Sequence, residues 1–174
     1  MTTKKPKPSP RIPMPEQPAA VRRGNFSEVT LGYDLSMAMT EAARCLQCKK
    51  PACVKGCPVE VNIRDFIGFV AKGDVEGAFA AIKATNSLPA VCGRVCPQEI
   101  QCEGACILGK KGEPVAIVRR ERFVADEFAA RSACEQITGQ PDCALTRDDI
   151  TAAFIGSGPS SLTVAGYLTA RGIK

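Results

Sequence analysis

The chain has 174 residues, of which 45% are hydrophobic and 24% are charged, a composition typical of a soluble chain with one ordinary domain and a modest core. No hydrophobic run approaches the roughly 18 residues that a membrane-spanning helix needs. The Lys- and Pro-rich start also lacks the hydrophobic stretch of a secretory signal. We therefore expect a cytoplasmic protein with no membrane partner.

The chain contains ten cysteines and no histidine. The lack of histidine excludes His-ligated haem, His-containing zinc sites, Ser-His-Asp triads and Cys-His nucleophile pairs. Because the cytosol keeps thiols reduced, so many cysteines favour metal or iron–sulfur binding over a disulfide framework. No catalytic residue is predicted.

The net charge of +5 is confined to the first 24 residues, which hold six basic side chains and one acidic side chain. Residues 25–174 hold 17 of each and are neutral. We interpret residues 1–24 as a solvated, extended, Pro-rich arm that can lie against a partner, rather than as a nucleic-acid-binding segment.

Short polar residues mark where the first helices begin. Asp34 or Ser36 can cap a helix that ends shortly before the first cysteine. Asn62 and Asp74 are favourable caps for two more helices, each with its hydrophobic residues on one face. The pattern predicts a helical hairpin over residues 62–84.

The Cys-rich stretches 45–58 and 88–106 are predicted to be loops. Pro114 suits the first turn of a long helix. The fold class predicted is a mostly α-helical domain over residues 25–133, followed by a linker over residues 134–150 and a different unit beyond it.

The cysteines form two clusters with an internal echo, since both contain C-x3-C-P. The first reads C-x2-C-x4-C-x3-C-P, and its members are Cys45, Cys48, Cys53 and Cys57. The second consists of Cys92, Cys96, Cys102 and Cys106. A four-thiolate zinc site usually has two C-x2-C pairs, and only Cys45 and Cys48 form one, so the spacing favours iron–sulfur over zinc.

A [4Fe–4S] cluster needs four ligands, of which three come easily from one short loop and the fourth usually comes from elsewhere. One cluster would then take Cys45, Cys48 and Cys53 of the first loop together with Cys106. The other would take Cys57, Cys96 and Cys102. Cys92 is one candidate for the missing eighth ligand.

The helix after Pro114 offers the other candidate. At 100° per residue from Ile117, Val124 falls at about 340°, Phe128 at about 20° and Glu121 at about 40°, so this carboxylate lies on the hydrophobic stripe. An inward carboxylate is costly unless it is paired, here with a neighbouring arginine, or binds metal. Four neighbours are expected to point elsewhere: Arg119, Arg120, Arg122 and Asp126. The residues alone leave Cys92 and Glu121 equally placed.

These motifs carry a resemblance to a known family. The segments 42–58, 86–97, 102–106 and 121–126 resemble the N-terminal iron–sulfur domain of the NADPH-dependent glutamate synthase small (beta) subunit. Similar domains occur in the large subunit of NADH-dependent ferredoxin:NADP oxidoreductase (sulfide dehydrogenase) and in dihydropyrimidine dehydrogenase. The match covers about residues 11–130 and the end of the chain.

The resemblance implies an α-helical ferredoxin-like domain with two [4Fe–4S] clusters. It assigns Cys45, Cys48, Cys53 and Cys106 to one cluster, and Cys57, Cys96, Cys102 and Glu121 to the other. It thereby favours Glu121 over Cys92, and a carboxylate ligand should shift the potential relative to four thiolates. Cys134 and Cys143 fall outside the pattern and are interpreted as ordinary free thiols.

Residues 151–174 read as a strand, a Gly-rich turn and a helix, the context in which a G-x-G-x-x-G/A pattern binds a dinucleotide. The pyrophosphate-binding residues would be Gly156, Ser157, Gly158, Pro159, Ser160 and Ser161. Because one strand and one helix cannot form a Rossmann core, we expect this chain alone not to bind FAD or NAD(P)H. It is interpreted as part of a longer flavoprotein, or as a chain completed by another chain.

The function expected from these features is electron transfer through two [4Fe–4S] clusters, between FAD and a partner subunit of an NAD(P)H-dependent oxidoreductase. The partner would be the glutamate synthase large subunit or a smaller flavin and iron–sulfur subunit. Two alternatives remain at this point: a non-redox zinc scaffold that docks a partner, and a standalone ferredoxin-like carrier.

Overall fold

The computed structural model describes residues 9–138 and 149–173, with the backbone alone for residues 132–138. Its regular structure is almost entirely helical, as the sequence predicts. None of the helices in these ranges is both long enough and apolar enough to cross a membrane. In chain order the helices are α1 (Ala19–Arg22), α2 (Leu35–Ala42), α3 (Ala52–Lys55), α4 (Ile63–Val70), α5 (Val75–Lys83), α6 (Pro89–Val95), the 3-10 helix η1 (Ile107–Lys110), α7 (Ile117–Thr138) and α8 (Pro159–Thr169).

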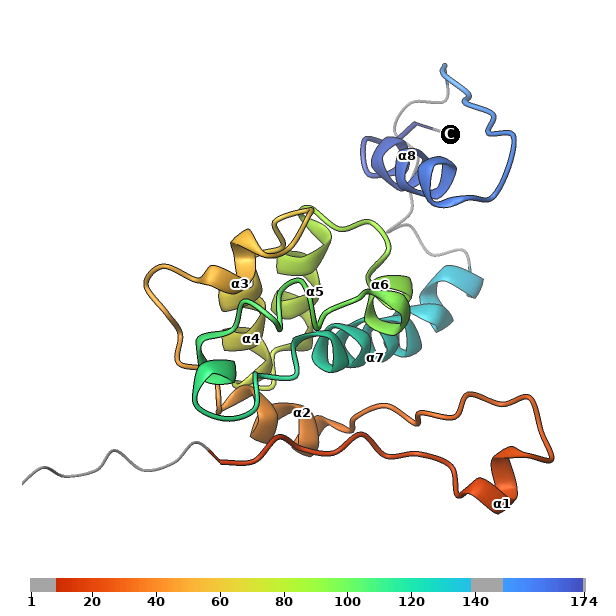
Figure 1. Ribbon diagram of the computed structural model, residues 1–174. Helices are drawn as coiled ribbons and strands as arrows, with labels where there is room; N and C mark the ends of the chain where they lie inside the picture. Colours follow the sequence, from red (N-terminus) through yellow and green to blue (C-terminus); the bar gives the residue numbers. More distant parts are fainter. Residues whose placement is uncertain (1–8, 139–148, 174) are drawn as a thin grey trace, which may run out of the picture.

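Helix α7 is the element on which the others pack. Helices α2, α4, α5 and α6 all contact it, and Figure 1 shows it crossing below α5 and α6. Its predicted stripe is buried, with Ile117 and Val124 in the core. Two arginines that were expected to point away from the stripe are also buried, Arg120 at 0% and Arg122 at 4% exposure. Pointing away from the stripe does not expose these side chains, because four other helices contact α7.

The predicted helix caps are confirmed. Asp34, Asn62 and Asp74 each accept a hydrogen bond from the backbone N–H three residues along the chain, at 2.7, 3.3 and 2.8 Å. Such bonds satisfy N–H groups that a helix leaves unpaired at its start. Helices α4 and α5 then pack as the predicted hairpin.

The prediction of a loop over residues 88–106 was wrong for its first half. Pro89 occupies the first position of α6, where its fixed φ angle favours a helix. Gly93 then allows α6 to lie against α7, because a Cβ atom here would lie 2.7 Å from the Arg122 backbone. The predicted loop 45–58 likewise contains the single turn of α3.

The long helix differs from its prediction at both ends. Helix α7 begins at Ile117, three residues after Pro114, which therefore does not occupy the first turn. It continues to Thr138, past residue 133 where the sequence pattern ends the helical domain.

The N-terminal arm is held by the domain itself. The Arg11 guanidinium forms a 2.7 Å ion pair with Glu103, and the Ile12 N–H donates to Glu41 at 2.8 Å. An antiparallel bridge joins Glu16 to Thr30, so the arm doubles back on itself before α2. Residues 9–18 are therefore not fully solvated, since Arg11 and Ile12 are partly buried against the domain while Ser9, Pro10 and Pro13 are exposed. Residues 1–8 lie outside the described ranges.

The C-terminal unit forms its helix but not its strand. Helix α8 begins directly after Gly158, as predicted, whereas residues 152–155 have no strand assignment. Ile155 is fully exposed and Phe154 is 41% exposed. A strand is defined by hydrogen bonds to a neighbouring strand, and the described residues supply none here.

Replacement of Gly93 by alanine should separate α6 from α7. We expect Gly93→Ala to lower the free energy of unfolding by about 1–3 kcal/mol, because the new methyl group overlaps the α7 backbone. Anaerobic urea unfolding of the purified protein measures this difference. Gly68→Ala in α4 is the matched control, since its Cβ would meet only the flexible Gln47 side chain at 3.7 Å. Equal stability of the two variants would contradict the prediction.

Candidate metal centres

Two cavities collect the cysteines of the helical domain. The eight cysteines with described side chains are all free thiols, and none of them is fully exposed. The first cavity is lined by Cys45, Cys48, Cys53 and Cys106. The second is lined by Cys57, Cys92, Cys96, Cys102 and the carboxyl group of Glu121. The structure thus brings together each of the two ligand sets that the resemblance implies.

The first cavity forms where the two Cys-rich segments meet. Gly56 makes this approach possible, because a Cβ atom here would lie 2.9 Å from the Gln101 carbonyl oxygen and 3.0 Å from the Ala105 Cβ. Cys53 lies on α3, and Cys106 immediately precedes η1. The close contact at Gly56 therefore joins three thiols of the first segment to one that follows about fifty residues later.

The thiols of the first cavity interact with one another. Burial, together with the nearby thiolate charges of Cys106 and Cys45, raises the pKa of Cys53 to about 11. Burial also raises the pKa of Cys45, while the positive charge of Arg120 acts in the opposite direction. A metal centre has to displace these protons, since the thiolate is the ligand form.

The second cavity combines thiols with a buried carboxyl group. Glu121 is 7% exposed, and burial raises its pKa to about 7 against the opposing effect of a hydrogen bond from Asn86. Burial likewise raises the pKa of Cys102, where Glu103, Cys57, Cys96 and Glu121 add like charge. The two cavities therefore hold two separate groups of mutually interacting acids.

Asn86 lines the second cavity and forms hydrogen bonds with three groups. Its Nδ2 donates to Glu121 Oε1 at 2.6 Å, and its Oδ1 accepts from the Leu88 N–H at 2.9 Å. The Leu88 N–H fixes the orientation of the amide, because only the oxygen can accept from it. The same oxygen lies 3.7 Å from Cys92 Sγ, which makes Cys92 the donor of an S–H···O bond.

The alternative role for Glu121, a buried ion pair with an adjacent arginine, is not observed. The Arg122 guanidinium instead pairs with Glu28 at 3.0 Å and donates to Thr30. Asn86 is the hydrogen-bonding partner of Glu121. The buried carboxyl group is therefore free of a salt bridge within the described part of the chain, and Glu121 lines the same cavity as the thiols.

The chemistry of each donor set fits an iron–sulfur cluster. Four thiols surround the first cavity, and four thiols and one carboxyl group surround the second, which is enough donors for one cluster in each. In the described ranges no three Cys, Asp or Glu side chains converge tightly on a single point that would suit one metal ion. The donors instead surround cavities.

The predicted dinucleotide-binding residues, 156–161, lie at the start of helix α8. Gly156 has φ of 103°, a value that favours glycine, and Gly158 immediately precedes α8. Side chains added at either glycine would meet no other atom within 4 Å among the described residues. Cys134 lies in α7 but its side chain is not described, and Cys143 lies outside the described residues.

Two buried polar residues were not identified from the sequence. Asn86 was noted only as the first residue of the family-like segment 86–97, and its contacts with Glu121 and Cys92 depend on the packing of α6 against α7. Arg120 was expected only to point away from the hydrophobic stripe, and the helical wheel gave no sign of its complete burial.

Comparison with known proteins gives consistent matches. The sequence profile of a family described as dihydropyrimidine dehydrogenase domain II, 4Fe–4S cluster, matches residues 22–133. The chain is 35% identical over 163 residues to the glutamate synthase [NADPH] small chain of Azospirillum brasilense, covering 92% of this chain and 33% of that protein. It is also 35% identical over 151 residues to the NAD-dependent dihydropyrimidine dehydrogenase subunit PreT of Escherichia coli, covering 84% of this chain and 34% of that subunit. The chain thus spans about a third of the length of these relatives.

Proposed function

This chain belongs to the family of the dihydropyrimidine dehydrogenase 4Fe–4S domain, and on that premise we propose that it is an electron-transfer module with two [4Fe–4S] clusters, one in each cavity. Such clusters accept and release single electrons without a change in covalent structure of the protein. The observation that carries the proposal is the sorting of the thiols into two separate donor sets.

We assign the ligands of the first cluster to Cys45, Cys48, Cys53 and Cys106. The same four thiols line one cavity, which supports the assignment. We assign the ligands of the second cluster to Cys57, Cys96, Cys102 and Glu121. The hydrogen bond from Asn86 Nδ2 to Glu121 Oε1, at 2.6 Å, supports the choice of Glu121, because such a bond is suited to hold an ionised carboxylate.

The protein would tune and protect these clusters by excluding water and by fixing the ligands. Phe66 and Ile63 form part of the second cavity wall, and both are buried in the core. Ile117 lines both cavities and so separates the two sites. Such surroundings control the reduction potential of a cluster through solvent access and hydrogen bonding.

The complete protein would use NAD(P)H and FAD. Residues 151–174 would open its flavin domain, with residues 156–161 near the pyrophosphate, and hydride transfer from NAD(P)H to FAD would supply electrons to the clusters. The relatives named as glutamate synthase small chain and as a dihydropyrimidine dehydrogenase subunit support this context. The electrons would leave to a second oxidoreductase subunit, such as a glutamate synthase large subunit or a flavin and iron–sulfur subunit.

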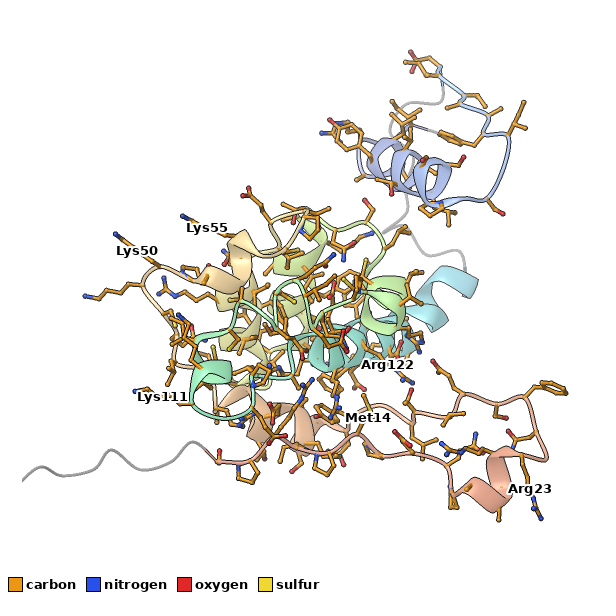
Figure 2. The ribbon with its side chains drawn as sticks, in the orientation of Figure 1. Met14, Arg23, Lys50, Lys55, Lys111 and Arg122 are labelled. Atoms are coloured by element: carbon orange, nitrogen blue, oxygen red, sulfur yellow. The ribbon has the colours of Figure 1, made fainter. Side chains whose placement is uncertain are left out.

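The first cavity has the surface suited to that partner. Leu46 and Ile107 line it and are 59% and 43% exposed, which gives an apolar mouth. Residues 45–59 and 104–112 contain no acidic side chain and carry exposed lysines. Figure 2 shows Lys50, Lys55 and Lys111 extending outward on the side of the molecule where α3 and η1 lie. A partner with an acidic surface around its own redox centre would match this face.

Iron and acid-labile sulfide analysis tests the proposed function. We expect about eight iron and eight sulfide per chain after anaerobic purification or reconstitution, since two cubic clusters supply four of each. Stoichiometric zinc without sulfide would instead support the scaffold alternative. A colourless protein that stays free of iron after reconstitution would refute the proposal.

The assignment of the eighth ligand has its own test. Glu121→Ala should remove or alter one cluster and leave the other, whereas Cys92→Ala should leave both, because only Glu121 is assigned as a ligand. Electron paramagnetic resonance of the reduced variants, with iron counted per chain, separates the outcomes. An intact two-cluster spectrum in Glu121→Ala together with loss of one cluster in Cys92→Ala would reverse the assignment.

We call the lysine-bearing surface of residues 45–59 and 104–112 the docking face, and we expect reversal of its charge to slow electron transfer to an acidic partner. Lys49→Glu with Lys50→Glu should slow electron transfer from the reduced protein to an acidic ferredoxin, used as a probe, by about tenfold at low salt, because electrostatic attraction accelerates encounter. Stopped-flow absorbance over a range of ionic strength measures the rate. The control is Lys72→Glu with Lys83→Glu, which makes the same change of net charge at exposed lysines outside residues 45–59 and 104–112. Equal slowing in both pairs would refute a localised docking face.

A further inference from the structure

The second cavity has one donor group more than a cluster uses. Four thiols and one carboxyl group line it, whereas a [4Fe–4S] cluster offers a single position on each of its four irons. The proposed ligands are Cys57, Cys96, Cys102 and Glu121, and Cys92 is left over. The first cavity has no such surplus, because all four cysteines that line it are assigned as ligands. The extra thiol therefore distinguishes the second site from the first.

Cys92 and Glu121 lie side by side where α6 packs against α7. A Cβ atom at Gly93 would lie 2.7 Å from the Arg122 backbone, so the two helices touch at these residues. Cys92 and Glu121 immediately precede the two contact residues in the sequence. Cys92 also lies about one helical turn before Cys96, whose N–H donates to the Cys92 carbonyl oxygen at 3.1 Å. The extra thiol is thus close to two of the proposed ligands.

One buried amide contacts both groups. Asn86 Nδ2 donates to Glu121 Oε1 at 2.6 Å, and Asn86 Oδ1 lies 3.7 Å from Cys92 Sγ. Asn86 is 6% exposed and lines the same cavity, and the bond from the Leu88 N–H fixes the direction in which its amide points. The carboxyl group and the thiol are therefore held at the two ends of one oriented amide. Because their helices are already in contact, an exchange between them needs side-chain movement alone.

The iron at the Glu121 position would be the one that the site holds least tightly. Iron–sulfur clusters are usually bound by soft thiolate ligands, whereas a carboxylate is a hard donor that suits ions such as Mg²⁺, Ca²⁺ and Mn²⁺. In the second cluster, thiolates would bind three irons and the carboxylate would bind the fourth. Release of the carboxylate would leave that iron without a protein ligand, next to the Cys92 thiol.

We propose that Cys92 is an alternative fourth ligand of the second cluster, which binds this iron when Glu121 releases it and so prevents its loss. The inference rests on the proposed function. In the exchange, the Fe–O bond to Glu121 breaks and an Fe–S bond to Cys92 forms, while the thiol proton passes to the released carboxylate. The total charge of the site stays the same, and no oxidant or reductant is required.

Oxidative loss of iron from the anaerobically purified protein tests the inference. Ferricyanide removes one electron from a [4Fe–4S]²⁺ cluster, which then releases Fe²⁺ and becomes [3Fe–4S]⁺. Electron paramagnetic resonance detects the three-iron cluster, and a ferrous chelator measures the released iron. We expect Cys92→Ala to release iron from the second cluster about tenfold faster than the wild type, because loss of a group that supports a metal site typically weakens metal binding by this factor or more.

Val91→Ala is the matched control for this measurement. Val91 belongs to the same helix, is 48% exposed and is not among the residues that line the second cavity. It should therefore release iron at the wild-type rate. Release from the first cluster should be the same in all three proteins, so the difference between them reports on the second cluster.

Variants of Glu121 test the exchange directly. Glu121→Ala should keep a four-iron second cluster with a changed signal, because Cys92 then binds the fourth iron. Glu121→Ala with Cys92→Ala should lose this iron or the whole cluster, whereas Glu121→Ala with Val91→Ala should behave like Glu121→Ala alone. If Glu121→Ala does not fold, Glu121→Leu, which keeps most of the side-chain volume, replaces it in all three proteins.

Equal rates of iron release in Cys92→Ala and the wild type would overturn the inference. Equal iron contents in Glu121→Ala and in the double variant with Cys92→Ala would also overturn it. So would the absence of the second cluster from untreated Cys92→Ala, since Cys92 would then be the resident ligand. Failure of the proposed function would be seen separately, as untreated wild-type protein that lacks iron and sulfide.

Discussion

The arrangement of both cavities depends on how closely the Cys-bearing segments approach helix α7 and each other. Gly93 brings α6 onto α7, which places Cys92 and Cys96 beside Glu121, and Gly56 brings the first Cys-rich segment onto the second. Both contacts are too short for any side chain with a Cβ atom. Helix α4 contributes to both cavities, with Ile67 lining the first and Ile63 and Phe66 lining the second, so a small core positions two groups of cysteines.

Features set by local sequence were predicted well, and features set by tertiary packing were not. Asp34, Asn62 and Asp74 cap helices as expected because a cap bonds to a backbone group only three residues away. The helix at α6 was missed because the close approach at Gly93 stabilises it. The strand at residues 152–155 was predicted from its hydrophobic run, but a strand needs a neighbouring strand that local sequence does not supply.

The candidate site shows the same division. Cys spacing together with the family resemblance predicted which cysteines share a cavity, and the helical wheel predicted that Glu121 is buried. Arg120 could not be predicted in this way, because the wheel identifies one apolar face and α7 is covered on several. Asn86 was also missed, since its hydrogen bonds join residues that are 35 positions apart.

The two proposed clusters would have the same formal charge, because a carboxylate and a thiolate each contribute −1. Replacing one thiolate by Glu121 therefore changes the donor atom and its hydrogen bonds but not the total charge of the site. A difference in potential between the clusters must then arise from ligand character and from the surrounding charges. The residues that line the first cavity include no carboxyl group, whereas Glu121 lines the second and accepts a hydrogen bond from Asn86 at 2.6 Å. The donor atom of Glu121 and this hydrogen bond are therefore the features that would give the second cluster a potential of its own.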